Sequence, residues 1–462
     1  MGQSNLGSVI EDHALERVPD GERENWLVIS WNTVGLITTL VILFFGALVC
    51  FVAGVRIALL AGLLSFAVGS GLAFGLARIA VETGHSNTLI TRKYGLGTRG
   101  SALASVIFGF LIVGFLAVEN ALLYRGFLFF FDLADNWSSR LLVYGSMTIA
   151  WIALTAWGFG VVTRTSSVMT VGFFAVLAWM VGHMLLVGGG EGELLFASRL
   201  DAGTLSAMGI TSNVDKFVFA FNLLVGPACA LALNTADFGR YGKSTGHVTA
   251  AAMIAIGMQS LVIMLIGGIL MQAAAPTMVE WLAATRGIPS EEAGRQLLQS
   301  PDSIAATFIL FGGVAGFALM ILAQAKAQVL NNYSSSLCIA NLFDALFRWR
   351  PGRLAFVVLA NVIALAMLYG KILHFVEDWI KLLGVLLSAL AATIISDYYF
   401  VRPRLGATDD TPAGTNWSGV IAIVVAVISA HWLLRPYQPV EVLTSIVSVA
   451  VIYPLLRLRI LR

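Results

Sequence analysis

The sequence predicts an all-α polytopic membrane protein that crosses the bilayer about twelve times. Two observations support this fold class. Of the 462 residues, 58% are hydrophobic and only 12% are charged, which is about half the charged share of a soluble domain. The apolar residues are also gathered in runs of about 20, the length that a helix needs to span the hydrocarbon core.

Each apolar run is predicted to be an α-helix, because backbone groups in lipid must satisfy their hydrogen bonds within the segment. The alternating pattern of outer-membrane strands is not visible. In chain order, the predicted spans are residues 28–54, 56–81, 102–131, 140–162, 165–188, 216–236, 247–274, 304–331, 354–373, 376–400, 417–434 and 440–457.

Basic residues are concentrated in every second loop. They are Arg78, Arg92, Lys93, Arg99, Arg164, Arg240, Lys243, Arg348, Arg350, Arg353, Arg402, Arg404 and the terminal Arg457, Arg459 and Arg462. The positive-inside rule therefore predicts cytoplasmic termini, with the polar loops 189–215 and 275–303 outside. The first 25 residues lack the basic start and short apolar core of a signal peptide. A bacterial inner membrane is the expected location.

Two spans contain residues that weaken a helix. Span 1 has polar residues between Asn32 and Thr39, and span 6 has Gly226-Pro227 near its middle. Proline removes a backbone donor, which predicts either a broken helix of the kind that binds substrates in transporters, or a simple kink. The two spans are five apart, which suits an inverted repeat. The predicted units are a tail (1–25), a first five-helix repeat (26–188), an extracellular loop (189–215), a second five-helix repeat (216–400) and a segment with helices 11 and 12 (401–462).

Ionisable and amide side chains occur at membrane depth in two spans. Glu119 and Asn120 lie inside span 3, and Lys326 lies inside span 8. At 100° per residue, Lys326 points roughly away from a face of span 8 that carries Gln324, Gln328, Asn331, Asn332 and Ser335. Such a helix is surrounded by protein or a water-filled cavity, and each buried charge is a functional candidate. The alternatives are interhelical hydrogen bonds and a structural ion pair between Glu119 and Lys326.

Several segments resemble the signatures of one transporter family. Residues 234–241, Asn-Thr-Ala-Asp-Phe-Gly-Arg-Tyr, resemble a motif of nucleobase:cation symporter family 1, which includes the purine-cytosine permeases. Further matches follow in order at Tyr333, Ala340-Asn341, Ile395-Ser396-Asp397-Tyr398-Tyr399, Asn416-Trp417 and His431-Trp432. The resemblance implies the leucine-transporter fold, a five-plus-five inverted repeat with two extra C-terminal helices. It also implies transport of nucleobases, hydantoins, allantoin or related heterocycles.

The resemblance implies a substrate site in spans 3 and 8. Phe115 matches the aromatic residue that stacks on the flat substrate, and Glu119 matches a residue that bonds to its edge. Asn332 matches the asparagine that holds the substrate, with Asn331 beside it. Gln328 suits the same task, because amides can read the donors and acceptors of a heterocycle.

Spans 1 and 6 complete the implied substrate site. Thr39 matches the substrate position of span 1, and Pro227-Ala228 matches the pair at the span 6 break. The second residue of that pair is usually aromatic, so one face of the aromatic sandwich is missing here. The buried Glu119 favours a ligand with a donor-rich or cationic edge, such as an aminopyrimidine.

The family's sodium site is altered in this chain. The resemblance places carbonyl ligands at Gly35 and Thr38 and further ligands at Ala323, Lys326 and Ala327. A lysine at that site would fill the cation's space with its own charge. The expectation is therefore transport without sodium, with proton coupling permitted because a desolvated lysine can titrate.

The sequence thus predicts a permease that imports a small N-heterocycle by alternating access, and not an enzyme. The alternatives are a transporter of the same fold for an amino acid, an amine or another solute, a receptor or channel, and an intramembrane enzyme. The expected partners are the substrate, membrane lipid and a proton or sodium ion, without nucleic acid. No cofactor or metal is expected, because Cys50, Cys229 and Cys338 lie in apolar segments without metal-ligand spacing.

Overall fold

The computed structural model describes residues 15–156, 159–187, 197–200, 202–293, 302–370, 372–406 and 414–460. Within these ranges the chain is nearly all helical, and no β-strand is formed. The main helices are α2 (Trp26–Ile37), α3 (Leu40–Ala53), α4 (Val55–Thr83), α5 (Asn87–Lys93), α6 (Gly97–Phe130), α7 (Trp137–Ala156), α8 (Phe159–Val187), α9 (Ala202–Ala207), α10 (Asn213–Gly239), α11 (Thr245–Gly257), α12 (Met264–Arg286), α14 (Asp302–Phe347), α15 (Arg353–Tyr369), α16 (Val376–Ser396), α17 (Arg402–Leu405), α18 (Trp417–Ile428) and α19 (Glu441–Leu455).

Most of the helices overlap the predicted spans. In the described part of the chain, eight are long and apolar enough to cross a bilayer, and the bent pair α2–α3 makes a ninth. Shorter apolar helices cover Ser167–His183, Arg353–Tyr369 and Trp417–Leu433. The polytopic helical fold is therefore confirmed, whereas the count of twelve crossings stays a prediction. Residues 1–14 of the predicted tail 1–25, residues 189–196 and 201 of the predicted loop 189–215, and residues 461–462 lie outside the described residues.

The predicted interruption of span 1 is present. α2 ends at Ile37 and α3 begins at Leu40, and the two helices are bent by 62°. Thr38 between them has non-helical backbone angles (φ −83°, ψ 61°), and Thr39 is extended (φ −122°, ψ 159°). The Thr39 side chain accepts a hydrogen bond from the Ile42 amide, so it caps the new helix.

A break in span 6 is not observed. α10 continues through Pro227 without interruption, so the expectation of a discontinuous helix there is wrong. Packing accounts for the neighbouring glycine: a Cβ on Gly226 would lie 2.8 Å from the Ile380 carbonyl oxygen of α16. The glycine therefore permits close contact between two helices, and the proline is accommodated within one of them.

Two predicted loop boundaries also differ from the structure. α12 extends to Arg286, because Met278 and Leu282 are buried and keep the helix packed beyond the predicted end at 274. Arg164, predicted to lie in a loop, belongs to α8. α14 contains one non-helical residue, Gly313 (φ 53°, ψ −130°), which separates a short leading segment from the long helix that follows.

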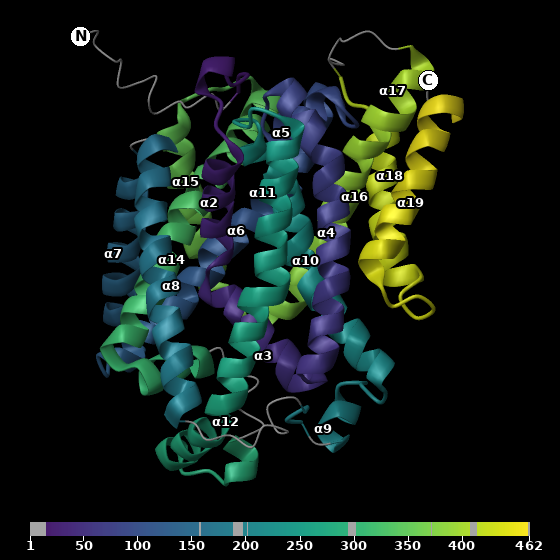
Figure 1. The fold of residues 1–462 in the computed structure, drawn as a ribbon. Helices are drawn as coiled ribbons and strands as arrows, with labels where there is room; N and C mark the ends of the chain where they lie inside the picture. The colour runs from purple at the N-terminus through teal and green to yellow at the C-terminus, as the bar shows by residue number, and fades with distance from the viewer. Residues whose placement is uncertain are drawn as a thin grey trace, which may run out of the picture.

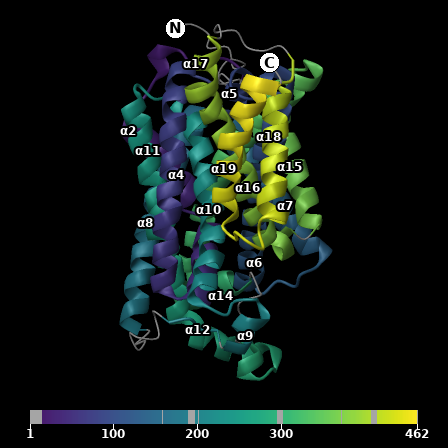
Figure 2. The same cartoon turned by 90° about the vertical axis from the view of Figure 1, so that its right-hand side faces the viewer.

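The helices pack in two groups (Figure 1). In the first group, α4 packs along α10 and α11, α3 along α12, and α2 along α11. In the second, α6 packs along α14, and α7 and α15 pack against both. α8 joins the groups by contacting α14 and α2, while α18 and α19 lie beside α16 on one flank (Figure 2). The first described residues and the end of α19 lie at the same end of the molecule (Figure 1).

Candidate functional site

A buried cavity lies between the two helix groups. Its free volume is about 30 Å³, enough for a few water molecules at most. The first group contributes Leu36, Thr39, Val41, Ile42, Pro227, Ala230, Leu231, Asn234 and Gln259, and the second contributes Ile112, Phe115, Glu119 and Asn331. Five of the predicted substrate residues therefore line one cavity: Thr39, Phe115, Glu119, Pro227 and Asn331.

Glu119 is the charged residue of this cavity. Its side chain is 2% exposed and accepts a hydrogen bond from Asn331 Nδ2 at 3.1 Å. The side chain of Thr39, at the start of α3, lines the same cavity as this carboxylate. The bend between α2 and α3 thus brings a hydroxyl from one helix group to a carboxylate of the other. A buried carboxylate needs such partners, because leaving it unpaired is costly.

Two amides that sequence reasoning missed also face the cavity. Asn234 Oδ1 and Gln259 Nε2 are buried, and neither has a hydrogen-bond partner among the described residues. Gln259 lies in a π-helical turn, Met258–Ile263, between α11 and α12, and such turns are frequent at functional sites. A lone glutamine in an apolar span was the available signal. Orphaned donors and acceptors on a cavity wall are groups that a polar ligand can satisfy.

Phe115 forms the aromatic wall of the cavity. Its ring packs against the Trp379 ring of α16, with ring centroids 5.3 Å apart and planes at 76°. This T-shaped contact fixes the orientation of the Phe115 ring. Gly114 permits the approach, because a Cβ there would lie 2.1 Å from the Trp379 ring.

Most of the polar face of α14 serves helix packing. Gln324 Nε2 donates to the Glu119 carbonyl oxygen at 2.9 Å. Gln328 Nε2 donates to the Leu116 carbonyl oxygen and to Asn120 Oδ1, both at 3.0 Å. Gln328, predicted as a substrate ligand, therefore ties α14 to α6 and does not line the cavity. The Asn120 amide oxygen also accepts from Trp151 Nε1 of α7 at 3.0 Å.

Asn332 and Ala228 likewise lie away from the cavity. Asn332 Oδ1 accepts a hydrogen bond from Asn361 Nδ2 of α15 at 2.6 Å, on the side of α14 that faces its own helix group. Ala228 faces α4, where a Cβ on Gly69 would lie 3.0 Å from the Ala228 methyl group. The structure thus places Asn331, one residue earlier, at the cavity in the position expected for Asn332.

Lys326, which the sequence analysis expects to stand in place of a coupling ion, lies beside the bend of the first span. Its Nζ donates a hydrogen bond to the Thr38 carbonyl oxygen at the bend between α2 and α3, and lies 4.2 Å from the centre of the Phe173 ring of α8. The side chain is fully buried, as are Ala323 and Ala327 on the same helix, and Gly35 is buried on α2. Among the described residues, Glu119 and Lys326 form no ion pair within 4.0 Å.

The motif residues of the sequence converge on α5 and the turn after it. Asp237 accepts from the Asn87 amide at 2.8 Å and from Asn87 Nδ2 at 2.9 Å, which caps the helix. Asn341 accepts from Arg92 Nε at 2.6 Å, and Asp397 accepts from the Gly95 amide at 2.8 Å. α10, α14 and α16 are thereby joined through one short helix.

The remaining motif residues hold helix ends together. Arg240 donates to the Tyr333 hydroxyl at 2.7 Å, which connects the end of α10 to the interior of α14. Asn416 caps α18 and donates to the Tyr453 hydroxyl at 3.2 Å. His431 and Glu441 lie 2.5 Å apart, between α18 and α19. These motifs therefore have structural partners far from the cavity.

The chain matches one known protein family by its sequence and several solved structures by its fold. Residues 28–452 match the profile of a family described as permeases for cytosine/purines, uracil, thiamine and allantoin. No curated protein matches the chain by sequence.

Solved structures match over nearly the whole chain. Inward-facing Mhp1 matches with a TM-score of 0.70 and 14% identity, covering 95% of this chain and 91% of that one. Mhp1, a nucleobase-cation-symport-1 family transporter, in a closed conformation with bromovinylhydantoin bound, matches with a TM-score of 0.67 and 16% identity, covering 98% of this chain and 94% of that one. A sodium-coupled sialic acid symporter matches with a TM-score of 0.61 and 13% identity, covering 95% of this chain and 90% of that one. The chain therefore has the leucine-transporter fold that the sequence predicts.

Proposed function

Because the chain belongs to the family of permeases for cytosine/purines, uracil, thiamine and allantoin, we propose that it imports a small N-heterocycle by alternating access. It is a nucleobase-type transporter and not an enzyme. The single observation that carries the substrate assignment is the cavity between the two helix groups. There a buried carboxylate, two orphaned amides and an aromatic ring face the same space.

The chemistry of the cavity favours a flat ligand with several N–H groups. The Glu119 carboxylate accepts hydrogen bonds, and Asn331 leaves its carbonyl oxygen available once its Nδ2 has bonded to Glu119. Asn234 Oδ1 adds an acceptor, and Gln259 Nε2 adds a donor. Phe115 supplies an aromatic face. An aminopyrimidine or an aminopurine, with adjacent donors and one acceptor, fits this set.

Transport requires the two helix groups to separate. A heterocycle needs more space than the free volume of about 30 Å³, so the cavity walls must move apart to admit it. The walls come from different groups, and the bend between α2 and α3 lies at their junction. Rocking of one group against the other is the motion that transporters of this kind use.

Lys326 is proposed to replace the coupling sodium ion. Its Nζ bonds to a carbonyl oxygen at the α2–α3 bend, and its position over the Phe173 ring suits a cation. Ala323 and Ala327 have no oxygen to offer a metal ion. The ammonium group then takes the place of the sodium ion, and because a desolvated lysine can titrate, the proposed coupling ion is a proton.

The proposal is tested by uptake into cells that express the protein in an inner membrane. Radiolabelled cytosine, uracil, hypoxanthine and allantoin are offered with and without sodium and with an uncoupler. Accumulation of at least one compound above cells lacking the protein is expected. If none of these compounds accumulates, while a labelled amine or amino acid does and unlabelled heterocycles do not compete with its uptake, the nucleobase proposal is wrong. The protein is then a transporter of the same fold for another solute.

A further inference from the structure

A second cavity lies at the end of the molecule that carries both described ends of the chain. It forms where α5, the start of α6 and the end of α14 meet, and its volume is about 290 Å³. It shares no residue with the cavity beside Glu119. Its lining is Arg92, Thr98, Arg99, Asp344, Ala345, Arg348 and Arg350.

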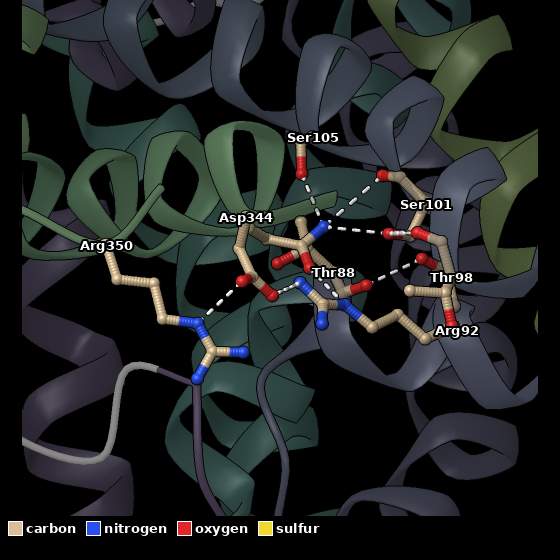
Figure 3. A network of polar contacts seen from close by, with 9 residues as sticks. Thr88, Arg92, Thr98, Ser101, Ser105, Asp344 and Arg350 are labelled. Carbon is tan, nitrogen blue, oxygen red and sulfur yellow. Dashed lines mark hydrogen bonds and ion pairs between the residues drawn. The ribbon is translucent and has the colours of Figure 1, made fainter. Parts of the chain in front are cut away.

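One carboxylate holds two of the four arginines. Asp344 pairs with Arg92 Nη2 at 2.7 Å through one oxygen and with Arg350 Nε at 2.6 Å through the other (Figure 3). Arg92 is held further by Asn341, whose Nδ2 donates to Ser101 and Ser105 of α6 at 3.1 and 2.8 Å. This network keeps the floor of the cavity in place.

The other two arginines leave the cavity with excess positive charge. Arg99 and Arg348 are exposed, and within the described chain neither guanidinium has an ion pair or a side-chain hydrogen bond. Asp344 is the one acidic residue among the lining residues of the cavity. Glu16 is a second acidic residue whose charge attracts the Arg350 guanidinium. Four guanidinium groups thus face a single carboxylate at the cavity wall.

The backbone at Arg348 is unusual. Its φ is 54°, in the left-handed region, at the position that ends α14. Helices commonly end with a residue in this conformation, but glycine is the usual residue because it has no Cβ. An arginine here carries a conformational cost that a glycine would avoid. Such strain is often retained where a side chain has a function.

The surface beside the cavity is apolar. Phe347 is 67% exposed and Trp349 is 52% exposed, directly before and after Arg348. Tryptophan and arginine together are typical of the boundary between membrane and water. The positive-inside pattern predicts that this boundary is the cytoplasmic one.

We propose that this cavity binds the phosphate group of an anionic lipid headgroup, with Arg99 and Arg348 as its ligands and the acyl chains along Phe347 and Trp349. Guanidinium groups match phosphate oxygens in geometry as well as charge. Basic pockets between transmembrane helices bind anionic headgroups in this way. The bound lipid joins α6 to the end of α14. The proposed site is independent of the transported substrate.

The test measures lipid binding to the purified full-length protein, without any transport assay. Phosphatidylglycerol or phosphatidylcholine is added to protein in detergent, and retained lipid is measured by native mass spectrometry together with the thermal midpoint. Inorganic phosphate and glycerol phosphate are tested in parallel. The expected result is retention of phosphatidylglycerol with a raised thermal midpoint, and no effect of the soluble phosphates.

The variants separate binding from folding. Arg348→Gly relieves the positive φ and removes one guanidinium, so the thermal midpoint without lipid stays or rises while phosphatidylglycerol binds roughly tenfold more weakly. Arg404→Gln, an exposed arginine at the same end and outside the cavity, keeps full binding. Equal lipid binding by wild type, Arg348→Gly and Arg99→Gln overturns the site. A full response to soluble phosphate overturns the lipid assignment.

Discussion

The Nζ atom of Lys326 donates a hydrogen bond to the carbonyl oxygen of Thr38, where α2 ends and the chain turns into α3. The bond connects a helix of the second group to the broken helix of the first. Asn331, five residues later on α14, bonds to Glu119 at the substrate cavity. One helix thus carries the proposed coupling charge and a proposed substrate ligand.

Glu119→Gln is expected to weaken substrate binding without unfolding the protein. The glutamine side chain has the same shape, so its oxygen can still accept a hydrogen bond from Asn331. It has one neutral acceptor oxygen, however, where the carboxylate has two oxygens that share a negative charge. Loss of a hydrogen bond to a charged group corresponds to roughly a tenfold loss of affinity. Equilibrium binding of the transported heterocycle measures this. Unchanged affinity would remove Glu119 from the substrate site.

Asn331 and Asn332 form a matched pair of neighbouring residues with different roles. Asn331→Ala should weaken substrate binding, because it removes the partner of Glu119 at the cavity. Asn332→Ala should leave affinity nearly unchanged and lower thermal stability, because Asn361 Nδ2 keeps the Val357 carbonyl oxygen but loses its other acceptor, at a cost of about 1–3 kcal/mol. Binding and thermal unfolding of both variants are compared. If Asn332→Ala weakens substrate binding and Asn331→Ala does not, Asn332 is the substrate ligand, as the sequence predicted.

Asp237→Ala is expected to loosen α5. It leaves the amide and the side-chain nitrogen of Asn87 without an acceptor in a buried place, and each lost partner costs about 1–3 kcal/mol. Asp237→Asn retains a carbonyl oxygen for the Asn87 amide and should recover part of the stability. Hydrogen exchange of residues 87–95 reports the change directly. Equal protection in wild type and Asp237→Ala would show that the cap is dispensable.

The sequence predicted the helices and the broken first span because those depend on local composition. The resemblance to the transporter family predicted Thr39, Phe115, Glu119 and Asn331 at one site, and all four line one cavity in the structure. Local pattern did not distinguish Asn331 from Asn332: neighbouring residues lie 100° apart on a helix, and the position of α15 decides which of them faces the cavity. The role of Gly226 likewise depends on a long-range contact, its close approach to the Ile380 carbonyl oxygen of α16.

Gln259 was missed for a different reason. It lies in a π-helical turn, where an extra residue shifts the faces of the helix, so regular periodicity does not show that the side chain points toward the cavity. Its role, and that of Asn234, became visible only through their unpaired polar atoms beside Glu119.

Lys326 is proposed to replace the coupling sodium ion with its own positive charge. The most direct measurement is the initial uptake rate in proteoliposomes with sodium fully replaced by potassium, for wild type and for Lys326→Met, which keeps the volume and removes the charge. We expect equal wild-type rates in both salts and a loss of at least about tenfold in Lys326→Met, since a charged hydrogen bond is removed. A wild-type rate that depends strictly on sodium, or a Lys326→Met rate equal to wild type, would contradict it.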